Sequence, residues 1–383
     1  MSKNYDVIVI GAGSIGVPAT MNLAYNRKKV LCIDSLPSPG QGNNKKAIGG
    51  VRATHSDFGK ITVCQRSIEI FSTWAAKHGD DIGWISNSYC FPAFDEATEK
   101  TLKDTLKIQK SFNLNIGWLN PDEIEELVPG LRKDALRGGT FSPDDGSCSP
   151  LRAINAFYFK SLEYGAEYRF SEKVIDIKYS KKAFAIKTDK ADYTCDFLIN
   201  AAGNYARDIS HLAGFECHVT PDSHEAAITD PVQRFFEPMV VDTIPAPGSK
   251  NYYFYQNNEG QVVFCITPEP LKYGIDNDTT SSFLPLCVTR MLQIYPRLKN
   301  LNVRRQWRGQ YPMTPDGSPI VGKLKENPFF IQAVGMCGQG FMMGPGIGEI
   351  LNRIVEDRLT ADDQRVLESF NPYRNFDKEE MFK

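Results

Sequence analysis

The hydrophobic positions of the first 34 residues predict a strand, a helix and a second strand. Residues 5–10 (YDVIVI) form a short apolar run rich in β-branched residues, which is typical of a buried strand. Residues 17–26 follow with small and apolar side chains that suit a helix packed on a sheet, and residues 30–33 (VLCI) form a second apolar run that ends at Asp34. This order predicts a strand-helix-strand unit.

Further along the chain, the pattern predicts helices and strands that are interleaved. Apolar or charged positions at helical spacing predict helices over residues 61–78, 96–112, 121–127, 280–295 and 347–357. Short runs of strand-forming residues predict strands near residues 139–142, 174–179, 184–188 and 192–199. Residues 217–270 alternate short strand-like runs with Pro and Gly, which is typical of an antiparallel sheet.

The turn between the first strand and the first helix carries the glycine motif Gly11-x-Gly13-x-x-Gly16. In this setting Gly11 allows the tight turn, Gly13 lets the backbone approach a pyrophosphate, and Gly16 lets the helix and the strand pack closely. The helix N-terminus offers free N–H groups and a positive dipole end to the phosphates. Asp34 lies 18 residues after Gly16, where its carboxylate can accept both ribose hydroxyls. The motif therefore predicts a bound dinucleotide.

Composition and charge narrow the class of protein. The length of 383 residues indicates two to three domains, and 42% hydrophobic residues suffice for a sizeable core. With 44 basic against 46 acidic residues and no basic run, nucleic-acid binding is not expected. No apolar stretch reaches about 18 residues, so no transmembrane segment is expected.

Cysteine usage and the N-terminus indicate a cytoplasmic protein. The nine cysteines lie at least 22 positions apart, which excludes CxxC redox and zinc spacings and suits a reducing compartment. The first residues run directly into the first strand without the pattern of a signal peptide. Cys217, His218 and His224 are close in sequence, but we interpret them as loop and core residues and expect no metal site.

Three later segments favour FAD over NAD. Residues 47–52 (AIGGVR) do not suit a plain NAD domain. Residues 197–203 (FLINAAG) form a strand that ends in small residues, which leaves room for backbone beside the pyrophosphate. Residues 335–349 form a glycine-rich loop that opens a helix, with Pro345 expected in its first turn. Such a helix start can stabilise negative charge on a reduced flavin.

Together, these motifs resemble those of a known family. They are GAGSIG at 11–16, IGGVR at 48–52 followed by RSIEIF at 66–71, INAAGNYA at 199–206, WRGQYPMTPDGSPIVG at 307–322 and GQGFMMGPGIGE at 338–349. Over nearly its whole length the chain resembles the FAD-dependent D-amino-acid-oxidase-like oxidoreductases, in particular the branch of sarcosine oxidase, glycine oxidase and L-proline dehydrogenase. The motif at 307–322 is the most specific of the five.

The resemblance implies an α/β fold, in which a Rossmann-like FAD-binding domain of the glutathione-reductase type carries an inserted α+β substrate domain built on an antiparallel sheet. The FAD-binding domain would comprise residues 1–86, 150–216 and 305–383, and the substrate domain residues 87–149 and 217–304. The residues expected to bind FAD are Gly11, Gly13, Ser14, Ile15, Gly16, Asp34, Ser35, Lys46, Ile48, Gly49, Gly50, Val174, Ala201, Ala202, Gly203, Gly338, Gln339, Gly340, Phe341 and Met342.

The resemblance also assigns roles beside the flavin to Arg52, Tyr253 and Met342. Arg52 stands where sarcosine-oxidase-like members place an arginine that pairs with the substrate carboxylate, and the bidentate geometry of arginine suits that role. The alternative is a solvated arginine or one paired in the core. Tyr253 matches a substrate-facing tyrosine, with Tyr252 as its rival and a plain core aromatic as a further alternative.

Three departures from the family pattern shape the expected chemistry. Met342 replaces a lysine that also holds the carboxylate, which suggests a substrate larger or more apolar than sarcosine. Phe264, counted from Tyr253, replaces a lysine thought to assist oxygen, which favours a dehydrogenase over an oxidase. Residues 309–311 (GQY) contain no flavin-linking cysteine, so FAD is expected to bind non-covalently, and we interpret Cys337 as a packing residue.

The expected function is oxidation of the C–N bond of an amino or imino acid by hydride transfer to flavin, with oxygen, a quinone or an electron-transfer protein as the acceptor. Arg52 would orient the carboxylate and Tyr253 would close the pocket. Two alternatives stay open. One is a 2-hydroxy-acid dehydrogenase, which needs a general base, and His55 is the histidine close to the Arg52 motif. The other is an FAD-binding subunit without catalytic activity.

Overall fold

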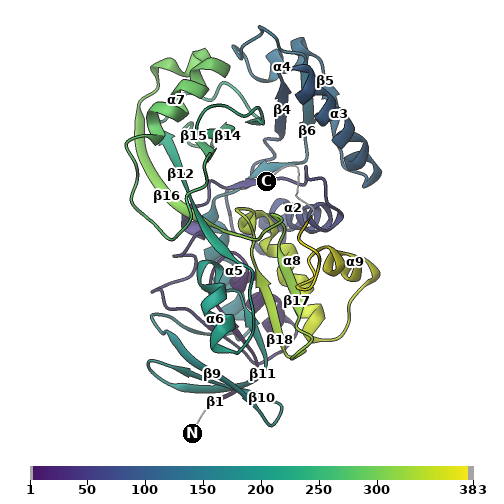
Figure 1. The fold of residues 1–383 in the computed structure, drawn as a ribbon, viewed down its shortest axis with the longest axis vertical. Helices are drawn as coiled ribbons and strands as arrows, with labels where there is room; N and C mark the ends of the chain where they lie inside the picture. Colours follow the sequence, from purple (N-terminus) through teal and green to yellow (C-terminus); the bar gives the residue numbers. More distant parts are fainter. Residues whose placement is uncertain (1–2, 378–383) are drawn as a thin grey trace.

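The computed structural model describes residues 3–377, which fold around two eight-stranded sheets. In Figure 1 the strands of the first sheet lie in the lower half of the molecule, and those of the second sheet lie in the upper half. Helices pack beside both sheets. The fold is therefore of the α/β type with mixed sheets, as the order of predicted elements indicated.

The first sheet has the order β17-β18-β11-β1-β2-β8, and a β9–β10 hairpin extends it from β11. Its parallel strands are β1 (Lys3–Ile10), β2 (Val30–Ile33), β8 (Glu167–Arg169), β11 (Asp192–Asn200) and β18 (Phe330–Val334). The antiparallel additions are β9 (Val174–Ser180), β10 (Ala183–Thr188) and β17 (Ile320–Lys323). Residues 7–10 of β1 are buried, because helices cover one face of the strand and the β9–β10 hairpin covers the other, and this segment of the sequence is therefore continuously apolar.

The second sheet has the order β16-β12-β15-β14-β13-β4-β6-β5. Its strands are β4 (Tyr89–Ala93), β5 (Gly117–Leu119), β6 (Gly138–Ser142), β12 (Thr220–Thr229), β13 (Met239–Asp242), β14 (Ser249–Gln256), β15 (Val262–Pro268) and β16 (Val303–Met313). All neighbours are antiparallel except β13 and β4. Residues 217–270 supply four of these strands, as their alternation predicted. A separate two-stranded sheet pairs β3 (Gly50–Val51) with β7 (Gly146–Ser147).

Most predicted helices are confirmed, and their caps explain where they begin. The helices are α1 (Gly16–Tyr25), α2 (Phe58–His78), α3 (Glu96–Ser111), α4 (Pro121–Leu127), α5 (Pro150–Glu163), α6 (Ala206–Leu212), α7 (Phe283–Ile294), α8 (Gly340–Val355) and α9 (Ala361–Ser369). The side chains of Asp57, Asp95 and Asn120 accept backbone N–H groups at the starts of α2, α3 and α4. Helix α5 was not predicted, although Ser149 and Pro150 form a cap and first-turn signal at its start.

The prediction for the last glycine-rich segment was wrong at its start. Helix α8 begins at Gly340 rather than near residue 347, and Pro345 lies inside the helix instead of in its first turn. Proline at this position removes the N–H that would bond the carbonyl of Phe341. The helix nevertheless continues through Pro345 to Val355, and the N–H of the next residue, Gly346, donates to the hydroxyl of Ser67 at 3.0 Å.

Helix α8 lies directly against the backbones of its two neighbours. A Cβ atom built on Gly344 would lie 2.0 Å from the carbonyl oxygen of Ser14, just before α1. A Cβ atom on Gly348 would lie 2.8 Å from the carbonyl carbon of Pro18 within α1, and Gly346 approaches the backbone of α2 at 2.5 Å. Real side chains do not make such short contacts, so all three positions require glycine.

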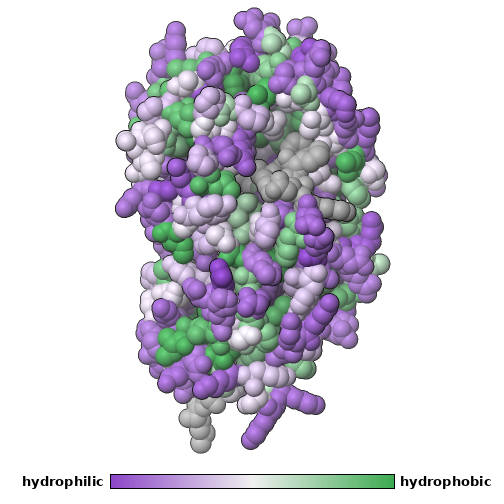
Figure 2. Space-filling view, viewed as in Figure 1, coloured by the Kyte–Doolittle hydropathy of each residue, from purple (hydrophilic) through white to green (hydrophobic). Residues whose placement is uncertain are grey.

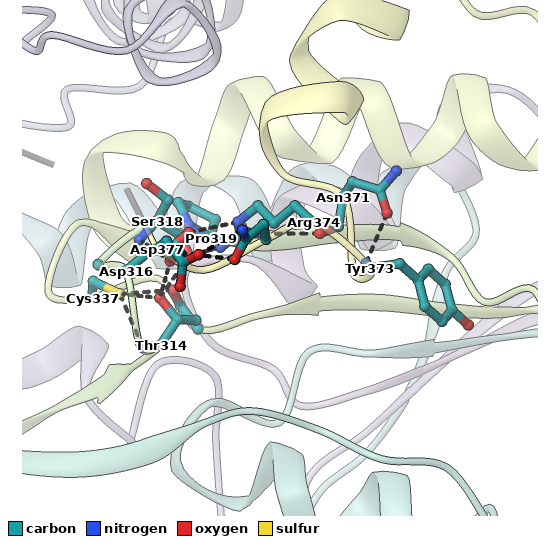
Figure 3. A network of polar contacts seen from close by, with 12 residues as sticks. Thr314, Asp316, Ser318, Pro319, Cys337, Asn371, Tyr373, Arg374 and Asp377 are labelled. Carbon is teal, nitrogen blue, oxygen red and sulfur yellow. Dashed lines mark hydrogen bonds and ion pairs between the residues drawn. The ribbon is translucent and has the colours of Figure 1, made fainter. Parts of the chain in front are cut away.

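A polar network holds the end of β16 against the C-terminal segment (Figure 3). Arg374 donates Nε to Oδ2 of Asp316 at 2.7 Å and Nη2 to Oδ1 at 2.9 Å. The Thr314 hydroxyl donates to Asp316 at 3.0 Å, and the Thr314 N–H donates to Sγ of Cys337 at 3.4 Å. The Thr-Pro-Asp-Gly part of the most specific motif is therefore a structural brace between β16, the loop before α8 and the chain that follows α9.

The surface gives no sign of a membrane-spanning element. Between residues 3 and 377, no helix combines the length and the apolar character needed to cross a bilayer. Figure 2 shows one face on which hydrophilic side chains predominate and hydrophobic ones form small, separate groups. Scattered hydrophobic residues of this kind are normal for a protein surface.

Candidate functional site

A cavity of about 1010 Å³ extends from the carboxyl ends of β1, β2 and β11 to one face of the second sheet. Small-molecule sites usually enclose about 300–1,000 Å³, so this cavity can hold an extended ligand together with a second, smaller one. In parallel α/β sheets, ligands bind outside the carboxyl ends of the strands, which is where the glycine motif lies.

The glycine motif forms the first wall of the cavity. Gly11 has φ +106°, and a Cβ atom there would lie 2.4 Å from the carbonyl oxygen of Ala201. Gly13 has no atom within 4 Å of the position of its missing Cβ and borders open space. Gly16 does not line the cavity, because it faces Gly11, whose carbonyl oxygen a Cβ would approach to 1.7 Å. Gly16 therefore serves helix–strand packing, the role that the motif predicts for it.

Asp34 lines the cavity at the end of β2 and is tied to the glycine loop. Its Oδ2 accepts the N–H of Ala12 at 2.7 Å, and its Oδ1 accepts the N–H of Leu36 at 2.8 Å. Burial raises the pKa of Asp34, and the two backbone N–H groups oppose that rise. The carboxylate thus both fixes the loop and presents its remaining lone pairs to a ligand.

The other predicted cofactor-binding residues also line this cavity. They are Ser14, Ile15, Ser35, Lys46, Ile48, Gly49, Gly50, Val174, Ala201, Ala202, Gly203, Gly338, Gln339, Gly340, Phe341 and Met342. They come from six separate segments of the chain, which the fold brings to one surface.

Two of these segments are held by contacts with the second sheet. The carbonyl of Lys46 accepts the indole N–H of Trp307 at 2.8 Å, and the carbonyl of Ile48 accepts the hydroxyl of Tyr255. On the other side, a Cβ atom on Gly338 would lie 2.4 Å from the ring of Tyr311, so the loop before α8 packs directly on that ring. The two sheets are therefore joined at the centre of the cavity.

Strand alternation decides which tyrosine of β14 faces the cavity. Tyr253 lines it, whereas the hydroxyl of Tyr252 is buried in the hydrophobic core and has no hydrogen-bond partner among the described residues. Tyr253 pairs across the sheet with Cys265, which lines the cavity as well. The hydroxyls of Tyr253 and Tyr311 lie 2.9 Å apart.

The interpretation of Phe264 was wrong. Phe264 is fully buried in the core beside Tyr252 and does not line the cavity. The side chains of β15 that do face the cavity are Cys265 and Thr267. The error arose because a count from Tyr253 places Phe264 on the wrong face of the strand.

Arg52 lines the cavity next to the end of β3. Its Nη1 donates to the carbonyl oxygen of Thr54 and lies 3.3 Å from Nδ1 of His55, and its guanidinium lies 5.8 Å from the centre of the Phe91 ring. Asp145 is fully buried nearby and accepts the N–H of Ala53 at 2.8 Å. Arg52 is therefore positioned by neighbouring groups while its side chain borders the cavity.

His55 does not lie where a base for the flavin end would have to lie. It is fully buried behind Arg52 and does not line the cavity. Burial, together with Arg52 and Lys60, holds its pKa well below the ordinary value, so it stays neutral. A different histidine, His224, which the sequence analysis interpreted as a loop or core residue, does line the cavity. The only signal for it was its alternation with Asp222 and Ala226 on one strand face.

The site fits an extended dinucleotide by its own geometry. Gly13 and Gly203 border open space on the side of the β-strand ends. At the other end, the buried Oε1 of Gln339 and Nδ1 of His224 have no partner within residues 3–377. Buried polar atoms usually have a partner, so these two indicate that a ligand or water completes the site.

Comparisons with known proteins agree with this geometry. The family model DAO, described as FAD dependent oxidoreductase, matches residues 6–354. The chain is 23% identical over 371 residues to glycine oxidase from Geobacillus kaustophilus (strain HTA426), with 95% of this chain and 96% of that protein covered. It is 23% identical over 384 residues to monomeric sarcosine oxidase from Bacillus sp. (strain B-0618), with 95% of each covered. The solved structure of L-proline dehydrogenase from P. horikoshii superposes with a TM-score of 0.90 at 28% identity over 98% of both chains.

Proposed function

The chain belongs to the DAO family of FAD-dependent oxidoreductases, and on this basis we propose that it is a dehydrogenase that oxidises the C–N bond of an amino or imino acid. FAD is its cofactor. When bound, FAD supplies the redox chemistry by accepting the hydrogen and the electron pair of the broken C–H bond. The residues of the chain bind the substrate, orient it and exclude water.

The observation that carries this proposal is the place of Arg52 in the cavity. It is the arginine of the cavity wall within residues 3–377, and the strands around it contribute Tyr89, Met239, Val241 and Tyr253. A guanidinium beside aromatic and aliphatic side chains suits a ligand with a carboxylate at one end and an apolar body. Met342 also lines the cavity where relatives carry a second cation, which supports a substrate more apolar than sarcosine.

Tyr253 and the start of α8 complete the proposed site. Tyr253 would close the pocket over the substrate, held in place by its hydrogen bond to Tyr311. The first turn of α8 lines the cavity with Gly340, Phe341 and Met342. Its free N–H groups and positive dipole end would stabilise negative charge that develops on the ring of the cofactor.

We further propose that FAD is bound without a covalent link and that oxygen is a poor acceptor. No cysteine occurs at residues 309–311, and the cavity-facing residues Cys265 and Thr267 of β15 offer no cation to attract superoxide. Acid precipitation should therefore release intact FAD into the supernatant. Flavin that stays in the protein pellet would contradict non-covalent binding. A quinone-like dye should reoxidise the enzyme faster than oxygen does, whereas rapid stoichiometric hydrogen peroxide would show an oxidase.

The test of the function is anaerobic bleaching of the bound flavin by a substrate panel. We expect bleaching by an amino or imino acid that carries an apolar side chain or ring. Bleaching by 2-hydroxy acids alone would favour the CH–OH dehydrogenase, for which His55 no longer provides a base. No bleaching by either class, with dithionite still reducing the flavin, would favour a non-catalytic FAD-binding subunit.

The same proposal assigns different roles to two parts of the chain. Residues 1–86, 150–216 and 305–383 would bind FAD, and residues 87–149 and 217–304 would form the inserted substrate domain. The hydrogen bond from Tyr255 of the substrate domain to the carbonyl of Ile48 supports an active site at the junction.

A further inference from the structure

Strand β12 places a histidine and a carboxylate together beneath the cavity. Asp222 and His224 are two residues apart and therefore lie on the same face of the strand. Nε2 of His224 lies 2.7 Å from Oδ2 of Asp222, whose other oxygen accepts the backbone N–H of Lys272 at 2.7 Å. Asp222 is fully buried, so the orientation of the imidazole is fixed from the side opposite the cavity.

The second nitrogen of His224 has no partner. Nδ1 is buried and makes no hydrogen bond within the described part of the chain, while the residue itself, 7% exposed, lines the cavity. Because Nε2 faces a carboxylate oxygen, the imidazole donates its proton there, and Nδ1 keeps a lone pair. An unsatisfied buried acceptor costs about 1–3 kcal/mol, so the site is built for something that hydrogen-bonds to Nδ1.

The ring of His224 also lies against Tyr311. Their centroids are 3.9 Å apart and the ring planes differ by 20°, which is a stacked arrangement. The hydroxyl of Tyr311 reaches Tyr253 at 2.9 Å, in the wall of the proposed substrate pocket. The imidazole of His224 is thus held between the Asp222 carboxylate and the face of the Tyr311 ring.

The other titratable groups around His224 either carry a proton or are engaged with hydrogen-bond or ion-pair partners. Burial raises the pKa of the hydroxyls of Tyr253 and Tyr311 and of the thiol of Cys265 far above neutrality, so they stay protonated. Glu225 on the same strand accepts hydrogen bonds from Thr280 and Gln306. On β16, Arg308 is paired with Asp276, and Lys46 from the adjoining loop donates to Asn277. These partners leave His224 as the group suited to accept a proton.

We propose that His224, oriented by Asp222, accepts the proton that the substrate nitrogen must lose before oxidation, through one bridging water at Nδ1. This assignment rests on the proposed function. The N–H bond of the substrate ammonium breaks, and its proton passes to Nδ1, which converts imidazole to imidazolium. The substrate C–H hydrogen then leaves with its electron pair to FAD, and the nitrogen lone pair forms the C=N bond. The ammonium thus loses one proton to His224 and then a hydride, which is a second proton with two electrons, and its product is the iminium ion.

Asp222→Asn is the variant that tests this chemistry. The amide keeps the shape and can still accept the N–H of Lys272, but its NH₂ group donates to Nε2 and therefore moves the imidazole proton to Nδ1. We expect flavin reduction to slow about 100-fold at pH 7 with unchanged FAD content, since positioned bases contribute about 10²–10⁴. The difference should shrink as the pH approaches the pKa of the substrate amine, because the substrate then arrives unprotonated. His218→Asn, at an exposed histidine outside the cavity, is the matched control.

The tautomer itself gives a readout that does not depend on activity. With only five histidines in the chain, selective ¹⁵N labelling should resolve an Nε2–H imidazole signal, separate from that of His55, which His224→Asn removes and Asp222→Asn converts to the Nδ1–H form. If the flavin of Asp222→Asn is reduced at the wild-type rate, or if its reduction rate falls by the same factor at every pH, the proposal is overturned. Loss of FAD from the variant would instead make His224 a cofactor contact. If no amino or imino acid reduces the flavin of the wild type, the proposed function is wrong, and so is this role for Asp222 and His224.

Discussion

The hydroxyls of Tyr253 and Tyr311 meet at 2.9 Å across two intervening strands of the second sheet. On this face Tyr253 lies beside the small Cys265 of β15, and Tyr311 stacks on the ring of His224 on β12. The tyrosine pair therefore spans the floor of the proposed substrate pocket. It connects the wall formed by β14 to the ring that supports Gly338.

Removing one hydroxyl from each of two neighbouring tyrosines should separate their roles. Tyr253→Phe breaks the bond to Tyr311 and should slow flavin reduction about 10-fold, because an intramolecular hydrogen bond contributes about 0.5–1.5 kcal/mol. Tyr252→Phe removes a buried hydroxyl that has no partner and should leave activity unchanged with equal or higher stability. Stopped-flow reduction and thermal unfolding of both variants measure this. Slower flavin reduction in Tyr252→Phe with unchanged reduction in Tyr253→Phe would instead place Tyr252 in the pocket.

Arg52→Lys should lose most of its turnover on a carboxylate substrate although the charge is kept. An arginine fork makes two parallel bonds to a carboxylate, whereas lysine offers a point charge with a shorter reach. A displacement of about 1 Å can cost about 100-fold in rate, because the reacting atoms must lie in a near-attack geometry. We expect slower reduction and weaker substrate binding in stopped-flow experiments, with normal FAD content.

The exposed Arg305→Lys on β16 serves as the control for Arg52. If Arg52 has only a structural role, the lysine variant will be fully active or will lose FAD and thermal stability together. Wild-type rate and affinity would show that the carboxylate is held elsewhere, and Arg308 would be tested next.

Asp34→Ala should weaken FAD binding. Each lost hydrogen bond to a charged acceptor is worth about 1.5–3 kcal/mol, or roughly 10- to 150-fold in Kd. The substitution also removes the acceptor for Ala12 and Leu36, so the glycine loop should loosen. Titration of apoprotein with FAD measures the change, with the exposed Asp196→Ala as a control. Undiminished occupancy after dialysis would remove Asp34 from the site.

Asp145 should make stability depend on pH. Burial raises its pKa to about 7, from 3.8 in the unfolded chain. Below about pH 4 both states hold the proton, and between about pH 4 and 7 only the folded state holds it, so the free energy of unfolding falls as the pH rises. The free energy of unfolding falls by at most about 4 kcal/mol in total, since a pKa difference of one unit corresponds to about 1.4 kcal/mol.

Asp145→Asn should remove this dependence, because an amide does not ionise and its oxygen can still accept the N–H of Ala53. Urea unfolding of both FAD-saturated proteins should show the variant gaining relative to the wild type from pH 4 to pH 7 and no further change above. Parallel curves across that range would mean that Asp145 ionises normally in the folded state.

The sequence predicted the elements better than it predicted their mutual register. The glycine motif, Asp34 and the small residues after β11 could be placed because each has a local conformational requirement. Phe264 could not, because the pairing of Tyr253 with Cys265 depends on the β14–β15 hairpin connection, and an error of one residue reverses the face. A count along the chain does not contain that information.

His224 was interpreted only as a loop or core residue for a related reason. Its partner Asp222 is close in sequence, but the stacking ring of Tyr311 lies on β16 and the cavity exists only once the two sheets meet. A lone histidine in a strand is more often a core residue than a functional one. The start of α8 was missed because proline normally marks a first turn, and here tertiary contacts override that preference.

The backbone contacts between α8 and α1 fix the separation of two loops that line the cofactor cavity. The loop before α1 and the loop before α8 lie at different parts of the dinucleotide cavity, and Gly344 and Gly348 set their separation with no side chain between the helices. Backbone atoms, unlike side chains, have no alternative rotamers, so this distance cannot adjust by a side-chain movement. Any residue larger than glycine at either position would push α8 away from α1 and so change the separation of the two loops that line the cofactor cavity.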